Sequence, residues 1–251
     1  MISVIIPVYN EENAIEETIN NIKRVMKDNN LTKGSEIIVV NDGSTDKTKE
    51  NALKTGVLVI DNKTNKGYGY SLKNGIKNAK NDLIVIIDAD KTYPFESVPE
   101  MLKIKEKGYA LVVGARTGKY YRESFFKSIL RKILKLLVEF MAGAKVKDVN
   151  SGLRVFNKND VIKFFPRLCD TFSFTTSQTL AYFMNGYKVA YVDIPYYKRE
   201  GKSKVKLFKY SFITFKYILQ AGIYYKPIKI FTLSMILCII IALIILCIII
   251  F

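Results

Sequence analysis

One segment constrains the fold of this chain more than any other. Five consecutive apolar residues, 83–87, are followed at once by Asp88, Ala89 and Asp90. A short uninterrupted apolar run is typical of a strand buried on both faces, as in parallel sheets. Ligands of open α/β sheets bind beyond the carboxyl ends of the strands, which is where the two carboxylates stand. Their oxygens are suitable ligands for Mg²⁺ or Mn²⁺ that bridges to phosphate. The alternative is an Asp-rich turn after a core strand, which would show the same sequence pattern.

The first half of the chain alternates apolar runs with helical segments. We expect strands at Ile2–Ile6, Glu36–Val40, Val57–Ile60, Leu83–Ile87 and Tyr109–Gly114. Asn13, followed three residues later by Glu16, predicts a capping box at the start of a helix, and Gly67 to Gly69 would open another. Strands that alternate with helices predict an α/β fold with a mostly parallel, doubly wound sheet.

The C-terminal end has a different composition. Ile230–Phe251 is an uncharged stretch of 22 residues, rich in Ile and Leu. At ~1.5 Å per residue it would span about 33 Å, close to the roughly 30 Å of a bilayer core. Residues 198–229 hold nine Lys or Arg and one acid, which favours a cytoplasmic location for that side. We expect a single-pass cell-membrane protein with a cytoplasmic catalytic domain (1–204), a juxtamembrane segment (205–227) and a transmembrane helix (228–251).

The overall charge implies an anionic partner. The chain has 39 basic and 23 acidic residues, a formal net charge of +16. A membrane surface or a phosphorylated substrate explains this charge. We expect no nucleic-acid partner, because the predicted membrane span next to the basic segment explains much of the positive charge more simply. Three cysteines do not suggest a disulfide framework. The chain has no histidine, so any metal site or general base must do without one.

Two segments before the tail combine lysines with apolar residues at helical spacing. They are Ser124–Gly143 and Lys206–Tyr225. Basic amphipathic helices of this kind can lie in the membrane interface. The other interpretation is an ordinary helix that packs on the sheet and has a solvated basic face.

Four motifs, taken in their order along the chain, resemble those of the family 2 glycosyltransferases of GT-A fold. They occupy residues 4–11, 40–46, 65–69 and 88–90. Three later motifs, at residues 114–116, 150–154 and 199–204, resemble the polyprenyl-phosphate (dolichol-phosphate) branch of that family, which includes enzymes like dolichol-phosphate mannose synthase. The resemblance covers residues 1 to about 205 and implies a nucleotide-sugar-binding fold.

The resemblance implies that the nucleotide lies against the N-terminal half of the chain. The residues implied at the nucleotide are Pro7, Tyr9, Glu11, Asp42 and Ala89. Asp42 would accept a hydrogen bond from the base, whose edge offers N–H donors. Without the resemblance, Pro7 would be interpreted as the end of a strand and Asp42 as part of a turn.

The resemblance also assigns the metal. Asp88 and Asp90 would hold Mg²⁺ or Mn²⁺ on the donor diphosphate, with Asp90 the nearer ligand and a catalytic residue. Members of the branch often carry a polar metal ligand two positions later, where this chain has the short Thr92. The third protein ligand is therefore left open, with water as the alternative.

The chemical class of the acceptor can be inferred from whether its attacking oxygen must lose a proton. A hydroxyl acceptor needs a general base, whereas a lipid monophosphate, with a second pKa near ~6, is mostly dianionic at pH 7. Such an acceptor needs positioning by cations, which fork-shaped Arg side chains provide. The candidates are Arg116, Arg154 and Arg199 as catalytic residues, Ser203 and Lys204 as helpers, and Arg122 and Arg131 as weaker candidates. Each Arg alone could equally be a surface charge or part of a structural ion pair.

One departure from the family pattern agrees with this acceptor. Many relatives carry an acidic residue within the segment Thr175–Leu180, where this chain has hydroxyl residues and Gln178. If that acid serves as a base in relatives, its absence fits an acceptor that needs none.

Together these observations predict an inverting hexosyltransferase. It would move a sugar from a nucleotide sugar, with UDP-sugar favoured over GDP-mannose, to polyprenyl or dolichyl phosphate. One alternative is a transferase acting on a hydroxyl acceptor in polysaccharide or glycolipid synthesis, disfavoured because the chain has no Trp for a Gln-x-x-Arg-Trp motif. Another is a non-catalytic membrane-bound nucleotide-binding protein. A homo-oligomer stays open.

Overall fold

The computed structural model describes residues 1–118, 120, 125–198 and 207–250. Its centre is a seven-stranded sheet with the order β3-β2-β1-β4-β6-β5-β7. The strands are β1 (Ser3–Val8), β2 (Glu36–Asn41), β3 (Leu58–Asp61), β4 (Leu83–Ile86), β5 (Leu111–Thr117), β6 (Arg154–Asn157) and β7 (Val189–Pro195). All neighbouring strands in this sheet pair in parallel except β6, which runs antiparallel to both β4 and β5. The five strands predicted from the sequence are confirmed as β1 to β5, with ends shifted by a few residues.

Helices cover both faces of the sheet. They are α1 (Ile15–Asp28), α2 (Thr48–Lys54), α3 (Tyr68–Asn78), α4 (Val98–Glu106), α5 (Phe125–Ala142), α6 (Lys158–Ile162), α7 (Phe174–Met184), α8 (Leu207–Tyr225) and α9 (Pro227–Ile250), with 3₁₀ turns η1 (Phe95–Ser97) and η3 (Phe165–Arg167). Successive residues of a strand point to opposite faces. Accordingly, Val4 and Ile6 of β1 pack with α1 and α4, whereas Ile5 packs with α3 and α7. The predicted doubly wound architecture is confirmed.

The predicted capping box at Asn13 and Glu16 is wrong. Helix α1 begins at Ile15, Ala14 occupies the N-cap position, and no side chain caps the helix. The backbone N–H groups of Ala14 and Ile15 both donate to the carbonyl of Glu11, at 3.1 and 3.0 Å. The turn that leaves β1 therefore satisfies the first donors of the helix through the backbone, and Glu16 acts only as an acidic residue favourable to the helix dipole.

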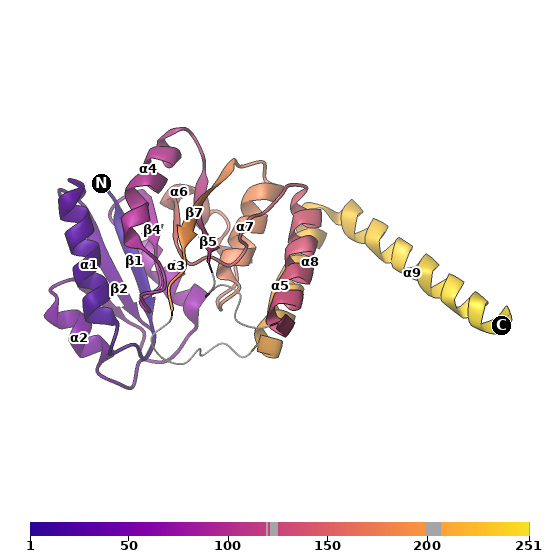
Figure 1. The fold of residues 1–251 in the computed structure, drawn as a ribbon, viewed down its shortest axis with the longest axis horizontal. Coiled ribbons are helices and arrows are strands. Elements are labelled where there is room, and N and C mark those ends of the chain that lie inside the picture. Colours follow the sequence, from indigo (N-terminus) through magenta and orange to yellow (C-terminus); the bar gives the residue numbers. More distant parts are fainter. Residues whose placement is uncertain (119, 121–124, 199–206, 251) are drawn as a thin grey trace.

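Three helices form a third core beyond the end of the sheet. Val138 and Met141 of α5, Leu180 of α7 and Ile218 of α8 are buried in one apolar cluster. Figure 1 shows α5, α7 and α8 at the end of the molecule from which α9 projects. Both amphipathic segments predicted from the sequence are thus helices with one packed face.

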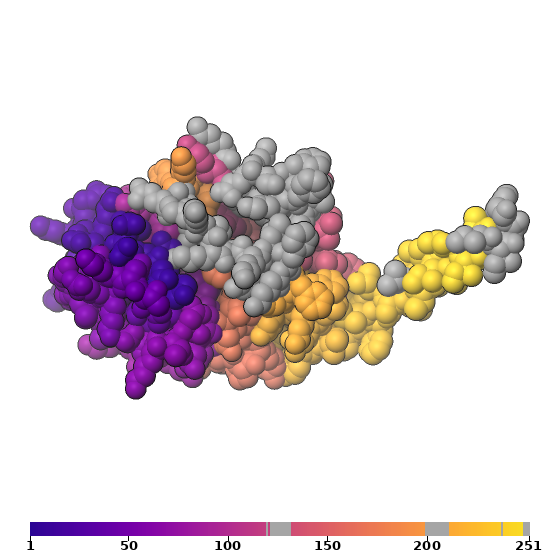
Figure 2. All heavy atoms as spheres, turned by 90° about the horizontal axis from the view of Figure 1, so that it is seen from below, coloured from indigo at the N-terminus to yellow at the C-terminus, as the bar shows by residue number. Residues whose placement is uncertain are grey.

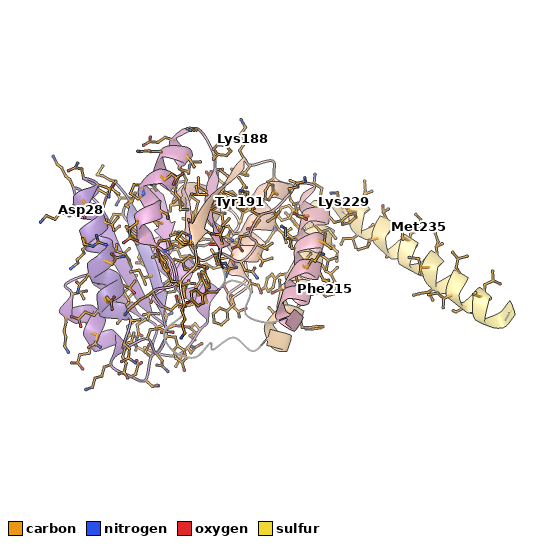
Figure 3. All side chains as sticks on the ribbon, viewed as in Figure 1. Asp28, Lys188, Tyr191, Phe215, Lys229 and Met235 are labelled. Atoms are coloured by element: carbon orange, nitrogen blue, oxygen red, sulfur yellow. The ribbon has the colours of Figure 1, made fainter. Side chains whose placement is uncertain are left out.

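Large apolar side chains remain exposed on these two helices. They are Ile133, Leu136 and Phe140 on α5, and Phe212, Phe215, Ile223 and Tyr224 on α8. Phe215 is labelled on α8 in Figure 3.

Helix α9 has the length and composition of a membrane span. Residues Pro227–Cys247 form an apolar stretch of 21 residues with mean hydropathy 3.1 and 0% of it buried, and Ile230 near its start is partly buried against the cluster of α5, α7 and α8. Figures 2 and 3 show the helix extending away from the body, with the side chain of Met235 far from it. A helix of this kind gives modest evidence for a membrane protein by itself.

Candidate active site

A pocket lies where the carboxyl ends of the central strands meet. Its cavity volume is about 360 Å³. It is lined by every residue predicted on the nucleotide side: Pro7, Tyr9, Glu11, Asp42, Asp88, Ala89 and Asp90. The topology explains this convergence, because β1, β2 and β4 are parallel neighbours and the chain leaves all three at the same edge.

Asp42, immediately after β2, organises the loop that borders the pocket. Its carboxylate is buried and accepts hydrogen bonds from the backbone N–H groups of Lys66 and Gly67, both at 2.9 Å, and from the Asn62 side chain at 3.1 Å. Gly67 has a φ of +105°, a backbone conformation that favours glycine. Asp42 therefore fixes the loop of residues 65–67 beside the pocket, and its contact with a base stays a prediction.

Asp88 is held from two sides. The hydroxyl of Tyr68 donates to Asp88 Oδ1 at 2.8 Å. Burial, and then the neighbouring Asp88 charge, raise the pKa of Tyr68 well above its usual value, so its hydroxyl stays a donor at neutral pH. On the other side lies Gly152, where a Cβ would come within 2.5 Å of Asp88 Oδ2. The antiparallel strand β6 explains this contact, because β6 starts at the edge where β4 ends and Gly152 comes just before it.

Asp90 is oriented by Thr92, the residue at the position where relatives often carry a third metal ligand. The hydroxyl of Thr92 donates to Asp90 Oδ1 at 2.6 Å and its backbone N–H to the same oxygen at 3.2 Å. Thr92 is completely buried and is not among the residues that line the pocket. Thr92 therefore orients the Asp90 carboxylate and is not itself placed to bind a cation in the pocket.

The donor set fits a divalent cation shared with a diphosphate. Both Asp88 and Asp90 line the pocket. Among the described residues, no group of three or more His, Cys, Asp or Glu side chains could hold a metal by itself. Mg²⁺ is usually bound by one or two carboxylates and completed by water and phosphate oxygens, so two aspartates suffice when a diphosphate is present.

Arg116, at the end of β5, forms a buried ion pair. Its Nε and Nη2 donate to Oδ2 and Oδ1 of Asp148 at 2.7 and 2.9 Å, and its backbone N–H donates to Oδ2 at 3.1 Å. Burial alone would raise the pKa of Asp148, but the charge and hydrogen bonds of Arg116 outweigh it and leave that pKa lowered. The guanidinium also lies 5.3 Å from the ring centre of Tyr196. Arg116 thus anchors the loop that precedes β6.

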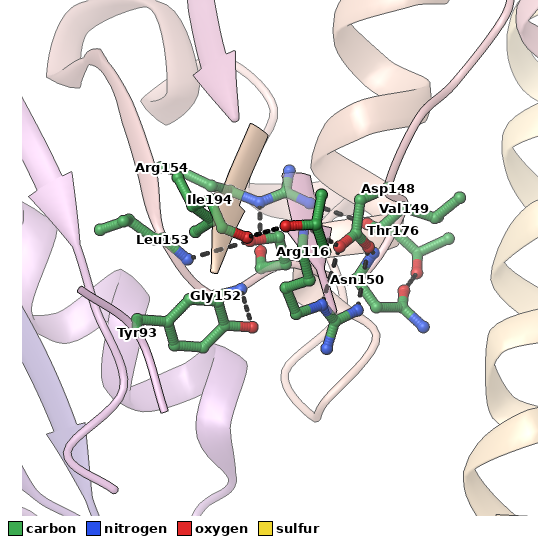
Figure 4. A network of polar contacts seen from close by, with 12 residues as sticks. Tyr93, Arg116, Asp148, Val149, Asn150, Gly152, Leu153, Arg154, Thr176 and Ile194 are labelled. Carbon is green, nitrogen blue, oxygen red and sulfur yellow. Dashed lines mark hydrogen bonds and ion pairs between the residues drawn. The ribbon is translucent and has the colours of Figure 1, made fainter. Parts of the chain in front are cut away.

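Arg154 needs reassignment. The sequence places it among the residues that bind the acceptor phosphate, yet its side chain is completely buried and lies outside the pocket lining. Its guanidinium donates to the carbonyls of Ser151 and Val149, at 2.8 and 2.7 Å, and to Thr179 Oγ1 and Gln178 Oε1, at 2.9 and 3.2 Å (Figure 4). With these donors engaged inside the protein, Arg154 ties the 149–151 loop to α7. Burial lowers its pKa.

Several predicted residues lie outside the described part of the chain. Arg199, Ser203, Lys204 and Arg122 are among them, and only the backbone of Arg131 is described. Their predicted contacts with an acceptor stay predictions.

The structure adds an aromatic wall that the sequence analysis missed. Tyr68 and Phe172 both line the pocket, and their rings are stacked with centres 5.6 Å apart. Phe172 arrives there because its loop packs on the start of α3, where the carbonyl of Cys169 lies so close to Gly69 that no Cβ would fit. Tyr68 could have been noticed inside the 65–69 motif, whereas nothing near Phe172 in the sequence announces this contact.

These features are typical of α/β enzymes that bind a nucleotide sugar at the carboxyl edge of the sheet. The family described as glycosyl transferase family 2 matches residues 3–165, and the chain belongs to that family. The predicted family and enzyme class are thereby confirmed.

Two curated relatives illustrate the similarity. The chain is 30% identical over 208 residues to a dolichyl-phosphate hexose transferase of Haloferax volcanii, covering 82% of this chain and 87% of that protein. It is 28% identical over 192 residues to an undecaprenyl-phosphate 4-deoxy-4-formamido-L-arabinose transferase of Serratia proteamaculans, covering 70% of this chain and 58% of that protein.

Solved structures confirm the fold. The glucosyl-3-phosphoglycerate synthase of Mycobacterium tuberculosis, in complex with Mn²⁺, UDP and phosphoglyceric acid, matches with a TM-score of 0.70 at 21% identity, over 88% of this chain and 78% of that one. Its complex with Mg²⁺ and UDP matches with a TM-score of 0.70 at 20% identity, over 88% and 79%. At these identities the likeness establishes the GT-A-like fold.

Proposed function

We propose that this protein transfers a sugar from a nucleotide sugar to the phosphate of a polyprenyl or dolichyl lipid, with inversion at the anomeric carbon. The observation that carries the proposal is one pocket that holds Asp42, which follows β2, together with Asp88 and Asp90, which follow β4, on either side of β1. The names of the two relatives, each a transferase to a polyprenyl-type phosphate, support the acceptor.

The donor lies along the carboxyl edge of β2, β1 and β4. Pro7, Tyr9, Glu11 and Ala89 line the pocket beside Asp42 and would surround the nucleoside. Asp88 and Asp90 would hold Mg²⁺ or Mn²⁺, which neutralises the leaving diphosphate. UDP is the favoured nucleotide, and the solved relatives that carry UDP with Mn²⁺ or Mg²⁺ support it.

The reaction needs no proton transfer by the protein. An oxygen of the lipid phosphate attacks the anomeric carbon while the bond from that carbon to the diphosphate oxygen breaks. The electron pair leaves with the nucleoside diphosphate, and the products are a glycosyl lipid phosphate and the free nucleotide. A phosphate that is already ionised at pH 7 can do this without a general base.

Cations beside the pocket would position the acceptor. Arg116 remains a candidate because it lies at the same sheet edge, and Arg199, Ser203 and Lys204 belong to the motif that comes just before α8. Helix α9 would span the membrane, with residues 1–204 forming the cytoplasmic catalytic domain. The exposed apolar side chains of α5 and α8 would then contact the membrane interface.

The direct test is a transfer assay in membranes. Membranes that contain the protein are incubated with labelled nucleotide sugars and a polyprenyl phosphate, with and without Mg²⁺ or Mn²⁺. The proposal expects label in the lipid phase for one nucleotide sugar, dependent on the metal. Transfer to sugar hydroxyls without any lipid-linked product would favour the alternative, a hydroxyl-acceptor transferase.

Asp90→Asn provides the matched variant. It keeps the size of the side chain and the acceptor oxygen for Thr92, but it removes the charge that a divalent cation needs. We expect transfer to fall by 10²-fold or more, a typical loss for electrostatic stabilisation of a leaving group, while the melting temperature stays close to that of the wild type. Full activity in this variant would exclude the metal role of Asp90.

A further inference from the structure

We propose that Thr175, Asn150 and the backbone N–H groups at the start of α7 form the subsite that receives the phosphate of the acceptor. This inference rests on the proposed function, since it names where the lipid phosphate of that reaction binds. It adds residues to the pocket that lie outside the metal and nucleotide positions.

The order of the strands places this subsite on the acceptor side. Across the sheet edge, Asp42 follows β2, Asp88 follows β4, and Asn150 precedes β6. The nucleoside and diphosphate positions therefore occupy one end of the pocket and Asn150 the other. The second end is also nearer the membrane-side helices, because α7 packs on both α5 and α8.

Asn150 is held so that it presents a donor. The hydroxyl of Thr176 donates to Asn150 Oδ1, and the backbone N–H of Asn150 donates to Asp148 Oδ1 at 3.1 Å. Asn150 lines the pocket, and no described residue accepts a hydrogen bond from its Nδ2. With Oδ1 engaged by Thr176, the group left for a ligand is an N–H donor (Figure 4).

Thr175 is a buried residue that lines the cavity. Its side chain is only 2% exposed, yet it lines the pocket, and no hydrogen bond of its hydroxyl to another described residue exists. Its Oγ1 is not among the fully enclosed side-chain atoms that lack a partner in the described part of the chain, so it is open to a ligand in the pocket.

The helix that carries Thr175 favours an anion. Helix α7 spans 11 residues and its first turn has no acidic residue; the N-cap residue Ser173 does not cap the helix, because its hydroxyl is hydrogen-bonded to the Thr214 hydroxyl at 2.7 Å. The start of a helix carries free N–H groups and partial positive charge, both suited to phosphate. An acidic side chain here would repel a phosphate, so hydroxyl and amide groups in this segment match an anionic acceptor.

The test uses the full-length protein in detergent, with farnesyl phosphate as acceptor probe and UDP with Mn²⁺ as donor-side probe. Thr175→Val keeps the shape of the side chain and loses the hydroxyl. Asn150→Asp keeps the oxygen that binds Thr176 and replaces the donor with a charge. Ser177→Ala, on the same helix, removes a hydroxyl that bonds to Phe174 and Cys169 and does not line the pocket.

We expect the KM for farnesyl phosphate to rise roughly tenfold in Thr175→Val, the scale of one hydrogen bond to a charged group, and further in Asn150→Asp. The affinity for UDP and Mn²⁺ should stay within about twofold, and Ser177→Ala should behave as the wild type. An unchanged KM for farnesyl phosphate, or a weakened affinity for UDP in its place, overturns the subsite.

A failure of the proposed function gives a different pattern. If the wild type transfers no sugar to farnesyl phosphate from any nucleotide sugar, the proposed reaction is wrong. Calorimetric binding of farnesyl phosphate then decides the subsite alone. Weaker binding in Thr175→Val than in the wild type supports it, and equal binding overturns it.

Discussion

At the residue scale, the geometry of Asp88 and Asp90, the two carboxylates proposed to hold the metal, depends on their immediate neighbours. Tyr68 donates to Asp88 and Thr92 donates to Asp90, so each carboxylate has one oxygen held by a hydroxyl. Both hydroxyls belong to residues that are not themselves ligands. Such supporting bonds keep a site within the narrow geometry that a cation requires.

Gly152 gives the clearest prediction at this scale. A Cβ on this residue would lie 2.5 to 2.7 Å from the Asp88 carboxylate atoms, and φ of Gly152 is not positive, so Gly152→Ala acts through this contact alone. We expect the carboxylate to shift and transfer to fall by at least about tenfold, because misplacement of a catalytic group by 1 Å can cost as much as 10²-fold. A steady-state assay with saturating Mn²⁺ measures it.

The control for Gly152→Ala is Gly56→Ala. Gly56 has a φ of +71° and no heavy atom within 4 Å of its added Cβ, so it tests backbone strain remote from the pocket. It should lower the melting temperature and leave turnover unchanged. Equal turnover in Gly152→Ala and the wild type would contradict the close contact.

At the element scale, the loop before β6 is fixed by two arginines, the partly buried Arg116 and the fully buried Arg154. Arg116 holds Asp148 in a two-pronged ion pair, and Arg154 holds the carbonyls of Val149 and Ser151. Between them they determine where Asn150 meets the pocket and where Gly152 meets the Asp88 carboxylate. The loop is therefore rigid because charged groups are satisfied within it, an arrangement that is costly to leave incomplete.

Asp148→Asn tests this anchor. Because the folded pKa of Asp148 is lowered, its ion pair stabilises the fold at every pH above the ordinary value of 3.8 and is lost only as the pH falls through the lowered pKa. We expect the variant to lose about 3–5 kcal/mol at pH 7, the usual cost of breaking a buried pair. Urea unfolding from pH 7 to pH 3 measures the difference.

The pH dependence distinguishes the ion pair from a simple loss of packing. The gap between the wild type and Asp148→Asn should be constant from pH 7 to about pH 5 and should narrow only in stronger acid. A gap that is small at pH 7, or that stays constant down to pH 3, would contradict the assignment.

The helices and strands also explain which parts of the fold and site could be predicted from the sequence. The apolar runs predicted β1 to β5 and the carboxylates at their ends, because a buried strand and its terminal motif are local features. The antiparallel strand β6 was missed, since four residues that begin with a charged Arg154 carry no strand pattern. For the same reason Arg154 was predicted at the phosphate: its burial depends on Gln178 and Thr179, which lie more than twenty residues away.

At the scale of the whole molecule, the body and α9 differ in whether their apolar side chains are buried or exposed. The body buries its apolar residues in three clusters, whereas α9 leaves Ile228, Ile239 and Ile240 exposed. Exposed apolar surface of this extent marks a contact surface, and the length of the helix fits a bilayer. A membrane would place the pocket, which is lined in part by Thr175 of α7, within reach of a lipid-borne phosphate.

Ile239→Arg tests whether α9 spans a bilayer. Ile239 lies near the middle of the helix and is 52% exposed, so an Arg there would face hydrocarbon. A charge at that depth costs about 2.5–3.5 kcal/mol of insertion free energy, and we expect much of the protein to move from the carbonate-washed membrane fraction to the supernatant. Ile228→Arg, at the end of the same helix beside Lys226 and Lys229, adds the same charge where it can reach the headgroups and should leave the protein in the membrane. If both variants stayed membrane-bound to the same extent, α9 would lie on the surface and its body would be held there by α5 and α8.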